Sequence, residues 1–329
     1  MQKFERVAVI AKPQGAISRY VRELTDLITR TGCTPYLDEN AAAHMPSDCP
    51  FESGSAEEIA RVCDVAVAIG GDGTMLGAAR AMAAYKVPVI GINAGRLGFI
   101  TDIVLEDMNR LLPAMLLGQY VADERSMLEG SVWREGNMLF EGLAVNDIGI
   151  SHGRALGMVE YTVYVDGLQM AVQRADGVLV STSTGSTAYA MAAGGPIMHP
   201  SVSSMLLVPI APHTLSNRPI VLGSHTKIDI EVNETRSAVA SFDAQVLIDV
   251  QAGDVLRVKV SKERFTMLHP VGYNHFDLLR RKLKWNYLPQ SEHPIHTPLQ
   301  DQTTPVQIPH PTTSEKSSEI GRASCRERV

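Results

Sequence analysis

The chain has few cysteines, and their spacing marks neither a metal site nor a disulfide framework. Four cysteines occur in 329 residues, at Cys33, Cys49, Cys63 and Cys325, and no two of them form a Cys-x-x-Cys pair. This pattern argues against a structural zinc site and against a small disulfide-bonded fold.

Long apolar runs and a dominant charge sign are also lacking. No stretch approaches the ~18 apolar residues that a membrane-spanning helix needs, and the apolar run at residues 7–11 is too short for a signal peptide. The 30 Lys and Arg residues against 36 Asp and Glu residues give a net charge of −6, so charge alone does not draw the chain to nucleic acid. We therefore expect a soluble cytoplasmic protein with no nucleic-acid or membrane partner.

The C-terminal segment has no aromatic residues. Residues 289–329 contain no Phe, Tyr or Trp, whereas six of the 18 prolines fall between Pro289 and Pro311. Such a segment buries too little apolar surface to offset its ordering entropy, so we predict a disordered tail. Its residues 319–329 resemble the translation of a common sequencing-adapter oligonucleotide; we expect them to be an artefact and exclude them from the fold prediction.

The remaining length suggests about two domains. Apolar runs at residues 7–10, 65–69 and 87–92 predict buried strands, and helical spacing over residues 17–28 and 75–85 predicts helices between them. This alternation is typical of a parallel sheet with right-handed crossovers. We therefore predict an α/β domain over residues 1–120.

Beyond that point the apolar pattern has period two. Val159, Tyr161 and Val163 alternate with polar residues, and Asp166-Gly167 supplies a hairpin turn. We predict a mostly antiparallel β domain over residues 121–270, interrupted by a helix at residues 186–193. Residues 276–285 form a basic stretch with helical spacing. We expect the segment that contains it, residues 271–288, to return to the first domain.

A glycine-rich loop follows the second predicted strand, and it is the first candidate for chemistry. The loop comprises Gly70, Gly71, Asp72, Gly73 and Thr74 and opens a helix. Glycines let the backbone approach phosphate closely, and the helix N-terminus favours an anion. A carboxylate here repels phosphate, so Asp72 indicates either a metal ligand or a base for an attacking hydroxyl. The simpler interpretation is a tight turn in which Asp72 caps the helix.

A second candidate is the hydroxyl-rich stretch from Asp176 to Tyr189, which continues to Gly194-Gly-Pro196. Its hydroxyl and amide groups suit a nucleotide, and Tyr189 could stack on a base; the alternative is a helix cap that bonds only its own backbone. Asn146-Asp147 is suited to holding ribose hydroxyls, although a plain turn explains an isolated pair equally well. Arg174 precedes Asp176 by two residues, so both side chains would lie on the same face of a strand. The simpler interpretation is that the two residues form a surface ion pair.

Clusters of His, Cys and carboxylates with metal-ligand spacing are not found in the sequence. We therefore predict no metal site built from protein ligands alone, and expect any ion to be Mg²⁺ or another divalent cation bound through phosphates. A Gly-x-Ser-x-Gly motif is also missing, which argues against a serine hydrolase.

Taken together and in this order, these segments resemble the bacterial NAD kinases. The resemblance spans most of residues 1–288. The glycine loop alone also occurs in lipid kinases and phosphofructokinases, whereas the 176–196 stretch is highly specific. The matching segments are Gly70–Thr74, Leu97–Thr101, Asn146-Asp147, Asp176–Tyr189 with Gly194–Pro196, Pro212–Pro219 and Asp243–Gln245.

The resemblance implies an α/β N-terminal domain with a parallel sheet and a β-sandwich-like C-terminal domain, with the active site between them. It implies a homodimer or homotetramer that transfers phosphate from ATP to the 2′-hydroxyl of the adenosine ribose of NAD, with a divalent cation. By the family pattern Asp72 is the base and Gly70–Thr74 hold phosphates. The NAD site would comprise Asn146, Asp147, Arg174, Asp176, Thr187, Ala188, Tyr189, Ala190, Met191, Ala192 and Gln245.

Three positions depart from the family pattern. Ser183 stands where proline is usual, Asp147 stands where glutamate is usual, and Gly157 lacks a polar side chain that some relatives present. None of these changes removes a reacting atom. Two alternatives stay open, a diacylglycerol-type lipid kinase and a non-catalytic dinucleotide sensor. The polar 176–189 loop argues against the lipid kinase, and the retained Asp72 argues against the sensor.

Overall fold

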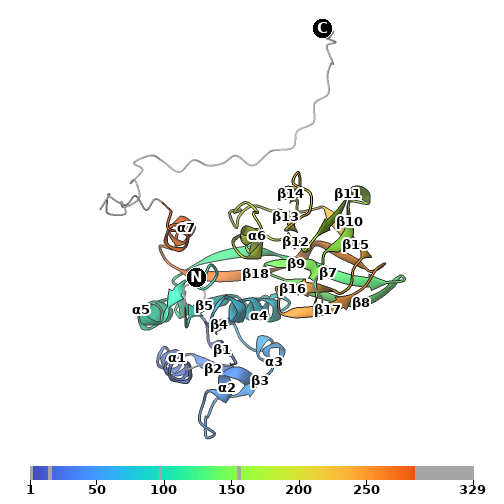
Figure 1. Ribbon diagram of the computed structural model, residues 1–329. Helices are drawn as coiled ribbons and strands as arrows, with labels where there is room; N and C mark the ends of the chain where they lie inside the picture. Colours follow the sequence, from blue (N-terminus) through green and yellow to red (C-terminus); the bar gives the residue numbers. More distant parts are fainter. Residues whose placement is uncertain (1–2, 14–16, 96–97, 154–156, 286–329) are drawn as a thin grey trace, which may run out of the picture. The chain divides into compact units, whose positions relative to one another are not determined.

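The computed structural model describes residues 3–13, 17–95, 98–153 and 157–285 (Figure 1). The predicted tail at 289–329, with its proposed artefact at 319–329 and Cys325, lies outside the described residues.

The first part of the chain forms a parallel sheet, as its buried apolar runs predict. The strands run in the order β5-β4-β1-β2-β3, and the short β6 pairs with β5. Every residue of β4 is buried, which is typical of a strand covered on both faces. The strands are β1 (Arg6–Ala11), β2 (Thr34–Asp38), β3 (Ser53–Gly54), β4 (Val65–Gly70), β5 (Val89–Asn93) and β6 (Ile103–Val104).

Helices alternate with these strands and flank the sheet (Figure 1). The predicted helix at residues 17–28 is confirmed: it buries Val21, Leu24 and Ile28, and the chain turns after it at Gly32, whose φ is +83°. The helices are α1 (Ser18–Arg30), α2 (Glu39–Ala43), α3 (Ala56–Ala60), α4 (Asp72–Ala83) and α5 (Leu105–Leu116).

One long strand, β18 (Val255–Pro270), joins the parallel part to the antiparallel part. Near its end Met267 pairs in parallel with Val89 of β5, while β7 (Tyr120–Arg134) runs antiparallel along its whole length. The first sheet therefore continues through β18 to β15 (Lys227–Glu234), β10 (Val159–Val165) and β11 (Leu168–Ala175). The domain boundary predicted at residue 120 consequently falls within a continuous sheet.

A second, six-stranded antiparallel sheet has the order β14-β13-β12-β9-β16-β17. Its apolar face packs on the antiparallel part of the first sheet in one core that includes Tyr161, Val180 and Phe242. The predicted combination of an α/β part with a sandwich-like β part is thus confirmed. The remaining strands are β8 (Asn137–Ala144), β9 (Asp147–His152), β10 (Val159–Val165), β11 (Leu168–Ala175), β12 (Gly177–Ser181), β13 (Ser204–Ile210), β14 (Ile220–Gly223), β15 (Lys227–Glu234), β16 (Ala238–Phe242) and β17 (Val246–Val250).

The continuous helix predicted at residues 186–193 is wrong. The chain forms a short 3₁₀ turn, η1 (Gly185–Thr187), and one α-helical turn, α6 (Tyr189–Ala192), separated by a non-helical Ala188 with φ −96° and ψ −129°. The hydroxyl of Ser186 donates to the carbonyl of Ser183 at 2.6 Å. Such local bonds compete with a regular helix, which explains the break.

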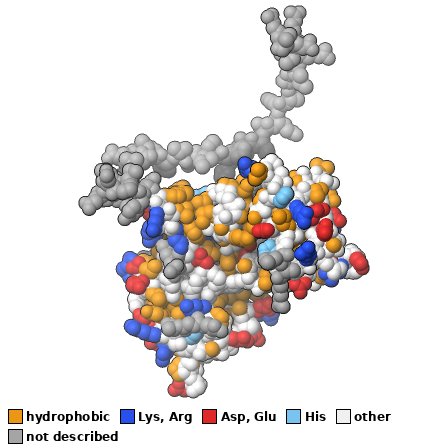
Figure 2. Space-filling model, viewed as in Figure 1, with side chains coloured by type: hydrophobic (Ala, Val, Ile, Leu, Met, Phe, Trp, Pro, Cys, Tyr) orange, Lys and Arg blue, Asp and Glu red, His pale blue; other side chains and the backbone are white. Residues whose placement is uncertain are grey.

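The helix predicted at residues 276–285 is present as α7 (His275–Leu283), whose N-terminus is capped by Asn274. Among the helices described, none has the length and apolar character to cross a bilayer. On the face that Figure 2 shows, basic and acidic side chains are intermingled, in keeping with the small net charge.

Candidate active site

Asp72 is held at the carboxyl edge of the parallel sheet, where β4 and β5 end. Its carboxylate accepts a hydrogen bond from the backbone N–H of Phe99 at 2.8 Å and from the hydroxyl of Thr101 at 2.9 Å. Two longer bonds, of 3.4 and 3.3 Å, come from the N–H groups of Ile100 and Thr101. The residue that caps α4 is Gly71, with no side-chain bond. Asp72 therefore binds the loop after β5 and does not cap its own helix.

Glycines make this arrangement possible because two segments approach each other closely. A Cβ atom on Gly98 would lie 1.7 Å from Oδ1 of Asp72, and a Cβ on Gly70 would lie 2.3 Å from the Thr74 hydroxyl oxygen. Neither position accommodates a side chain unless its neighbour moves. Gly70 thus lies tightly against the first turn of α4, whose N-terminus favours an anion.

The Asn146-Asp147 pair connects β8 to β9, and Asp243 holds its backbone. Asp243 lies in the turn between β16 and β17 with φ +52°, a left-handed conformation that aspartate tolerates better than most residues. Its carboxylate accepts from three successive backbone N–H groups, those of Val145, Asn146 and Asp147, at 2.9, 2.7 and 3.2 Å. The Asp243 side chain thereby holds the backbone of the Asn146-Asp147 turn. The side chains of Asn146 and Asp147 are therefore not needed to stabilise that turn.

The two side chains have acceptor atoms that face no protein donor among the described residues. The Oδ1 atom of Asn146 is buried without a hydrogen-bond partner there. Burial raises the pKa of Asp147 to about 7, and the negative charge of Asp243 adds to the shift. A buried amide oxygen and a carboxyl group of near-neutral pKa at one turn suit the recognition of hydroxyl or amine groups on a ligand.

The hydroxyl-rich loop packs directly on this turn. The backbone N–H of Thr182 donates to the carbonyl of Asn146 at 2.9 Å, and a Cβ on Gly185 would lie 2.1 Å from the same oxygen. Thr184 contributes a second buried oxygen, Oγ1, without a partner among the described residues. Ser183, where the family pattern has proline, donates its hydroxyl to the carbonyl of Pro200 at 3.2 Å.

Four of the predicted NAD-site residues line one cavity of about 470 Å³: Asn146, Asp147, Ala188 and Tyr189. The ring of Tyr189 is half exposed at this cavity, which leaves a face for stacking. The other walls come from strands β9, β12, β13, β16 and β17 of the second sheet. The lining also includes Ser151, Val178, Leu179, Ile210, Ser241, Asp243 and Leu247.

The other predicted residues lie elsewhere. Arg174 and Asp176 line a separate hollow of about 520 Å³. Since Ser181 pairs with Asp147 and Gly177 with Ser151, and the backbone N–H of His152 donates to the carbonyl of Asp176, Asp176 lies at the opposite end of β9, roughly 17 Å along the strand from Asp147. Thr187 and Ala190 are buried, Thr187 in the 3₁₀ turn and Ala190 against the core, whereas Met191 and Ala192 are at least partly accessible in α6.

Arg80 is a site residue that the sequence analysis missed. Its guanidinium contacts the Asp243 carboxylate at 2.6 Å and the side-chain oxygen of Gln245. Gln245 in turn donates to the carbonyl of Gly73 at 2.8 Å. The β16–β17 turn is therefore fastened to α4, which begins with Asp72. Arg80 lies two helical turns after Asp72, but its partner is far away in the sequence, so no local signal identifies it.

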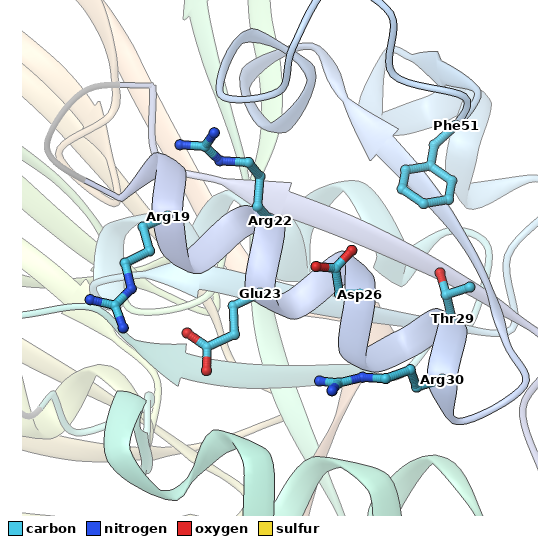
Figure 3. A pocket seen from close by; sticks show the side chains of 7 residues that line it. All are labelled: Arg19, Arg22, Glu23, Asp26, Thr29, Arg30 and Phe51. Carbon is cyan, nitrogen blue, oxygen red and sulfur yellow. The ribbon is translucent and has the colours of Figure 1, made fainter.

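A further hollow, of about 590 Å³, lies along α1 (Figure 3). Arg19, Arg22 and Arg30 share its lining with Glu23 and Asp26. The carboxylates offset the arginines, and the side amide of Asn109 on α5 already binds Glu23 at 2.6 Å. This mixed-charge flank is a solvated helix face and lacks the glycine loop, so it is not a candidate for the phosphate site at Gly70–Thr74. Among the described residues no group of three His, Cys, Asp or Glu side chains is placed to hold a metal ion.

Comparisons with known proteins point to one family. Family models for the ATP-NAD kinase N-terminal and C-terminal domains match residues 7–120 and 145–269. An NAD kinase of Cupriavidus pinatubonensis is 47% identical over 290 residues, which is 88% of this chain and 95% of that protein. An NAD kinase of an Acidovorax species is 46% identical and covers 86% and 97%.

Solved structures share the fold. The chain resembles a yeast NADH kinase complexed with NADH (TM-score 0.78, 23% identity), covering 87% of this chain and 89% of that one. It also resembles an NAD kinase from Archaeoglobus fulgidus in complex with ATP (TM-score 0.67, 26% identity), covering 85% and 98%.

Proposed function

The chain belongs to the ATP-NAD kinase family, and on that premise we propose that Asp72 deprotonates the 2′-hydroxyl of the adenosine ribose of NAD as it attacks the γ-phosphorus of ATP. The products are NADP and ADP. A secondary hydroxyl is a poor nucleophile at neutral pH, so a positioned carboxylate accelerates its attack by roughly 10²- to 10⁴-fold. The observation that carries the proposal is the fixed carboxylate of Asp72 beside the N-terminus of α4.

The phosphate donor is proposed to bind at Gly70–Thr74. Backbone N–H groups at the start of α4 attract the phosphates, and this mode needs no lysine. A divalent cation, Mg²⁺ by preference, would be held by the phosphates, since no described cluster of side chains holds one. When bound, it neutralises phosphate charge; the residues of this chain position the donor.

The NAD site is proposed to be built around Asn146, Asp147 and Tyr189. Asn146, whose Oδ1 atom has no hydrogen-bond partner among the described residues, lines the 470 Å³ cavity next to the Asp243 turn together with Asp147 and the half-exposed ring of Tyr189. Gln245 supports this site through its bond to Gly73. The residues Arg174, Asp176, Thr187, Ala188, Ala190, Met191 and Ala192 complete the proposed NAD-binding set.

Larger-scale properties are proposed on the family resemblance. We propose a cytoplasmic homodimer or homotetramer, with residues 1–120 and the returning segment 271–288 binding the donor and residues 121–270 binding NAD. The lipid kinase and the non-catalytic sensor are disfavoured, because the matching family models and the relatives of about 46% identity are NAD kinases.

A coupled assay tests the reaction. The full chain is given NAD⁺ with ATP and Mg²⁺, and NADP⁺ is detected with an NADP-specific dehydrogenase. Matched reactions omit the cation or replace ATP by polyphosphate. Formation of NADP⁺ that needs both ATP and the cation supports the proposal, whereas binding of NAD⁺ by calorimetry without any product would favour the sensor.

A further inference from the structure

A buried histidine lies at the end of β18, outside the cavity that binds substrate in the proposed function. The side chain of His269 is 1% exposed, its Nδ1 atom lies 2.8 Å from Oδ2 of Asp102, and its Nε2 atom lies 3.4 Å from Oδ2 of Asp123. The ring stacks on Tyr273 with centroids 3.7 Å apart. Burying an ionisable ring and two carboxylates costs free energy unless the groups are hydrogen-bonded or paired with opposite charge. The arrangement therefore suggests a role beyond packing.

The position of Asp102 indicates this role, because Asp102 directly follows the loop residues that donate hydrogen bonds to Asp72. Thr101 donates both its N–H and its hydroxyl to the Asp72 carboxylate. The Asp102 carboxylate is nearly buried, and its Oδ1 atom has no hydrogen-bond partner among the described residues. The bond from His269 is therefore what fixes this side chain, one residue away from the donors to Asp72.

We infer that His269 is a positioning residue for Asp72: by holding Asp102 it keeps the loop of residues 98–102 in the place where its donors orient the Asp72 carboxylate. This inference rests on the proposed role of Asp72 as the base. The connection reaches Asp72 from β18, the strand that joins the parallel and antiparallel parts of the sheet.

Five groups face the His269 ring: Asp102 from the loop, Asp123 and Arg125 from β7, and Tyr273 and His275 from the segment that leads into α7. Burial lowers the pKa of His269, but the two carboxylates outweigh it and the pKa is raised. When the ring loses a proton, one N–H remains. The contact of Nδ1 with Asp102 is shorter than that of Nε2 with Asp123, which favours keeping the proton on Nδ1. The bond to Asp102 thus persists in both charge states.

Two substitutions of His269 test the contributions of its two ring nitrogens separately. The amide of asparagine reaches the position of Nδ1, and the amide of glutamine reaches that of Nε2. His269→Asn keeps a donor for Asp102 and loses the contact to Asp123, whereas His269→Gln does the reverse. Both variants lose the imidazole and its stacking on Tyr273, so each is the control for the other.

The inference predicts that kcat falls by about 10- to 100-fold in His269→Gln, because a displacement of roughly 1 Å at a reacting group has an effect of that size. His269→Asn should stay within about 3-fold of the wild type in kcat, since the anchoring bond remains. The KM values for NAD⁺ and ATP should change less than kcat in both, because Asn146, Asp147 and Tyr189 are not touched. Equal losses in the two variants would overturn the inference and leave only a packing role.

A second pair of variants tests the bond between His269 and Asp102 by changing Asp102. This pair provides the test if His269→Gln does not fold. Asp102→Asn keeps an oxygen that accepts from Nδ1–H, and Asp102→Ala removes it. We expect the alanine variant to lose kcat like His269→Gln and the asparagine variant to retain it. Similar kcat values in Asp102→Ala and Asp102→Asn would contradict the inference.

The variant Asp72→Asn separates a failure of this inference from a failure of the proposed function. If Asp72→Asn keeps normal turnover, the base role itself is wrong, and the inference falls with it. If Asp72→Asn is impaired but His269→Gln behaves like His269→Asn, the inference alone is wrong. In the Asp72→Asn background, His269→Gln should lower kcat no further, because both act through one group; a full additional loss would place His269 in another role.

Discussion

Replacing Arg80 by methionine should destabilise the protein more than removal of a surface arginine does. Arg80 contacts Asp243 at 2.6 Å, with side-chain exposures of 20% and 0%. Removing one partner of a buried ion pair costs about 3–5 kcal/mol. Asp243 keeps its three backbone donors and Arg80 is partly exposed, so we expect a loss at or below the lower end, about 2–3 kcal/mol.

Urea unfolding at neutral pH measures this loss, provided that the slope against denaturant is unchanged. Arg110→Met is the matched control, because Arg110 pairs with Asp107 at 2.7 Å while both side chains are exposed, at 68% and 42%. Such a surface pair contributes no more than about 1 kcal/mol. If Arg80→Met loses no more stability than Arg110→Met, the β16–β17 turn is not fastened to α4 by Arg80, and our account of how the two halves of the site are joined is refuted.

Three further predictions concern the site. Gly98→Ala should lower kcat by about 10²-fold, because its Cβ would lie 1.7 Å from Oδ1 of Asp72 and displace it; steady-state kinetics with unchanged kcat would contradict this. Asp147, whose pKa burial raises to about 7, is ionised in the folded protein only above that pH, at an energetic cost. Asp147→Asn should therefore unfold at higher urea than the wild type at pH 8 but not at pH 4, and an equal difference at both pH values would refute it. Tyr189→Ala should raise the KM for NAD⁺ more than it lowers kcat, and the opposite pattern would show that Tyr189 is not mainly a binding contact.

The sequence predicts three of the parallel strands, at residues 7–10, 65–69 and 87–92, because each is a short buried apolar run. It does not predict β2, β3 and β6, which belong to the same parallel sheet. The strand at residues 65–69 and the loop Gly70–Thr74 that follows it lie as expected, with Asp72 at the carboxyl edge of the sheet. These features depend on local pattern, and local pattern is what a single sequence records.

Long-range pairing explains most of what could not be predicted. The parallel contact between Val89 and Met267 makes one sheet continuous through both parts, yet each strand alone looks like a member of its own domain. The ion pair of Arg80 with Asp243 and the bond of His269 to Asp102 likewise join residues far apart in the sequence. Without related sequences, such partners leave no mark on either segment.

The helix predicted at residues 186–193 failed for a local reason. Small residues with good helical propensity follow the hydroxyl-rich loop, but Ser186 and Thr187 bond back to the carbonyls of Ser183 and Thr184. Side-chain bonds of this kind offer the backbone an alternative to the helix. The sequence showed the hydroxyl groups but not which partner each would choose.

The central claim is that Asp72 is the base, and comparing the wild type with Asp72→Asn tests it most directly. Asparagine keeps the shape and the acceptor oxygen for Thr101, but its amide nitrogen replaces the oxygen that accepts from the Phe99 N–H. Calorimetry therefore first establishes that the variant still folds and binds NAD⁺. Its rate of NADP⁺ formation should fall by roughly 10²- to 10⁴-fold. A variant that binds NAD⁺ and forms NADP⁺ at a nearly normal rate would contradict the account.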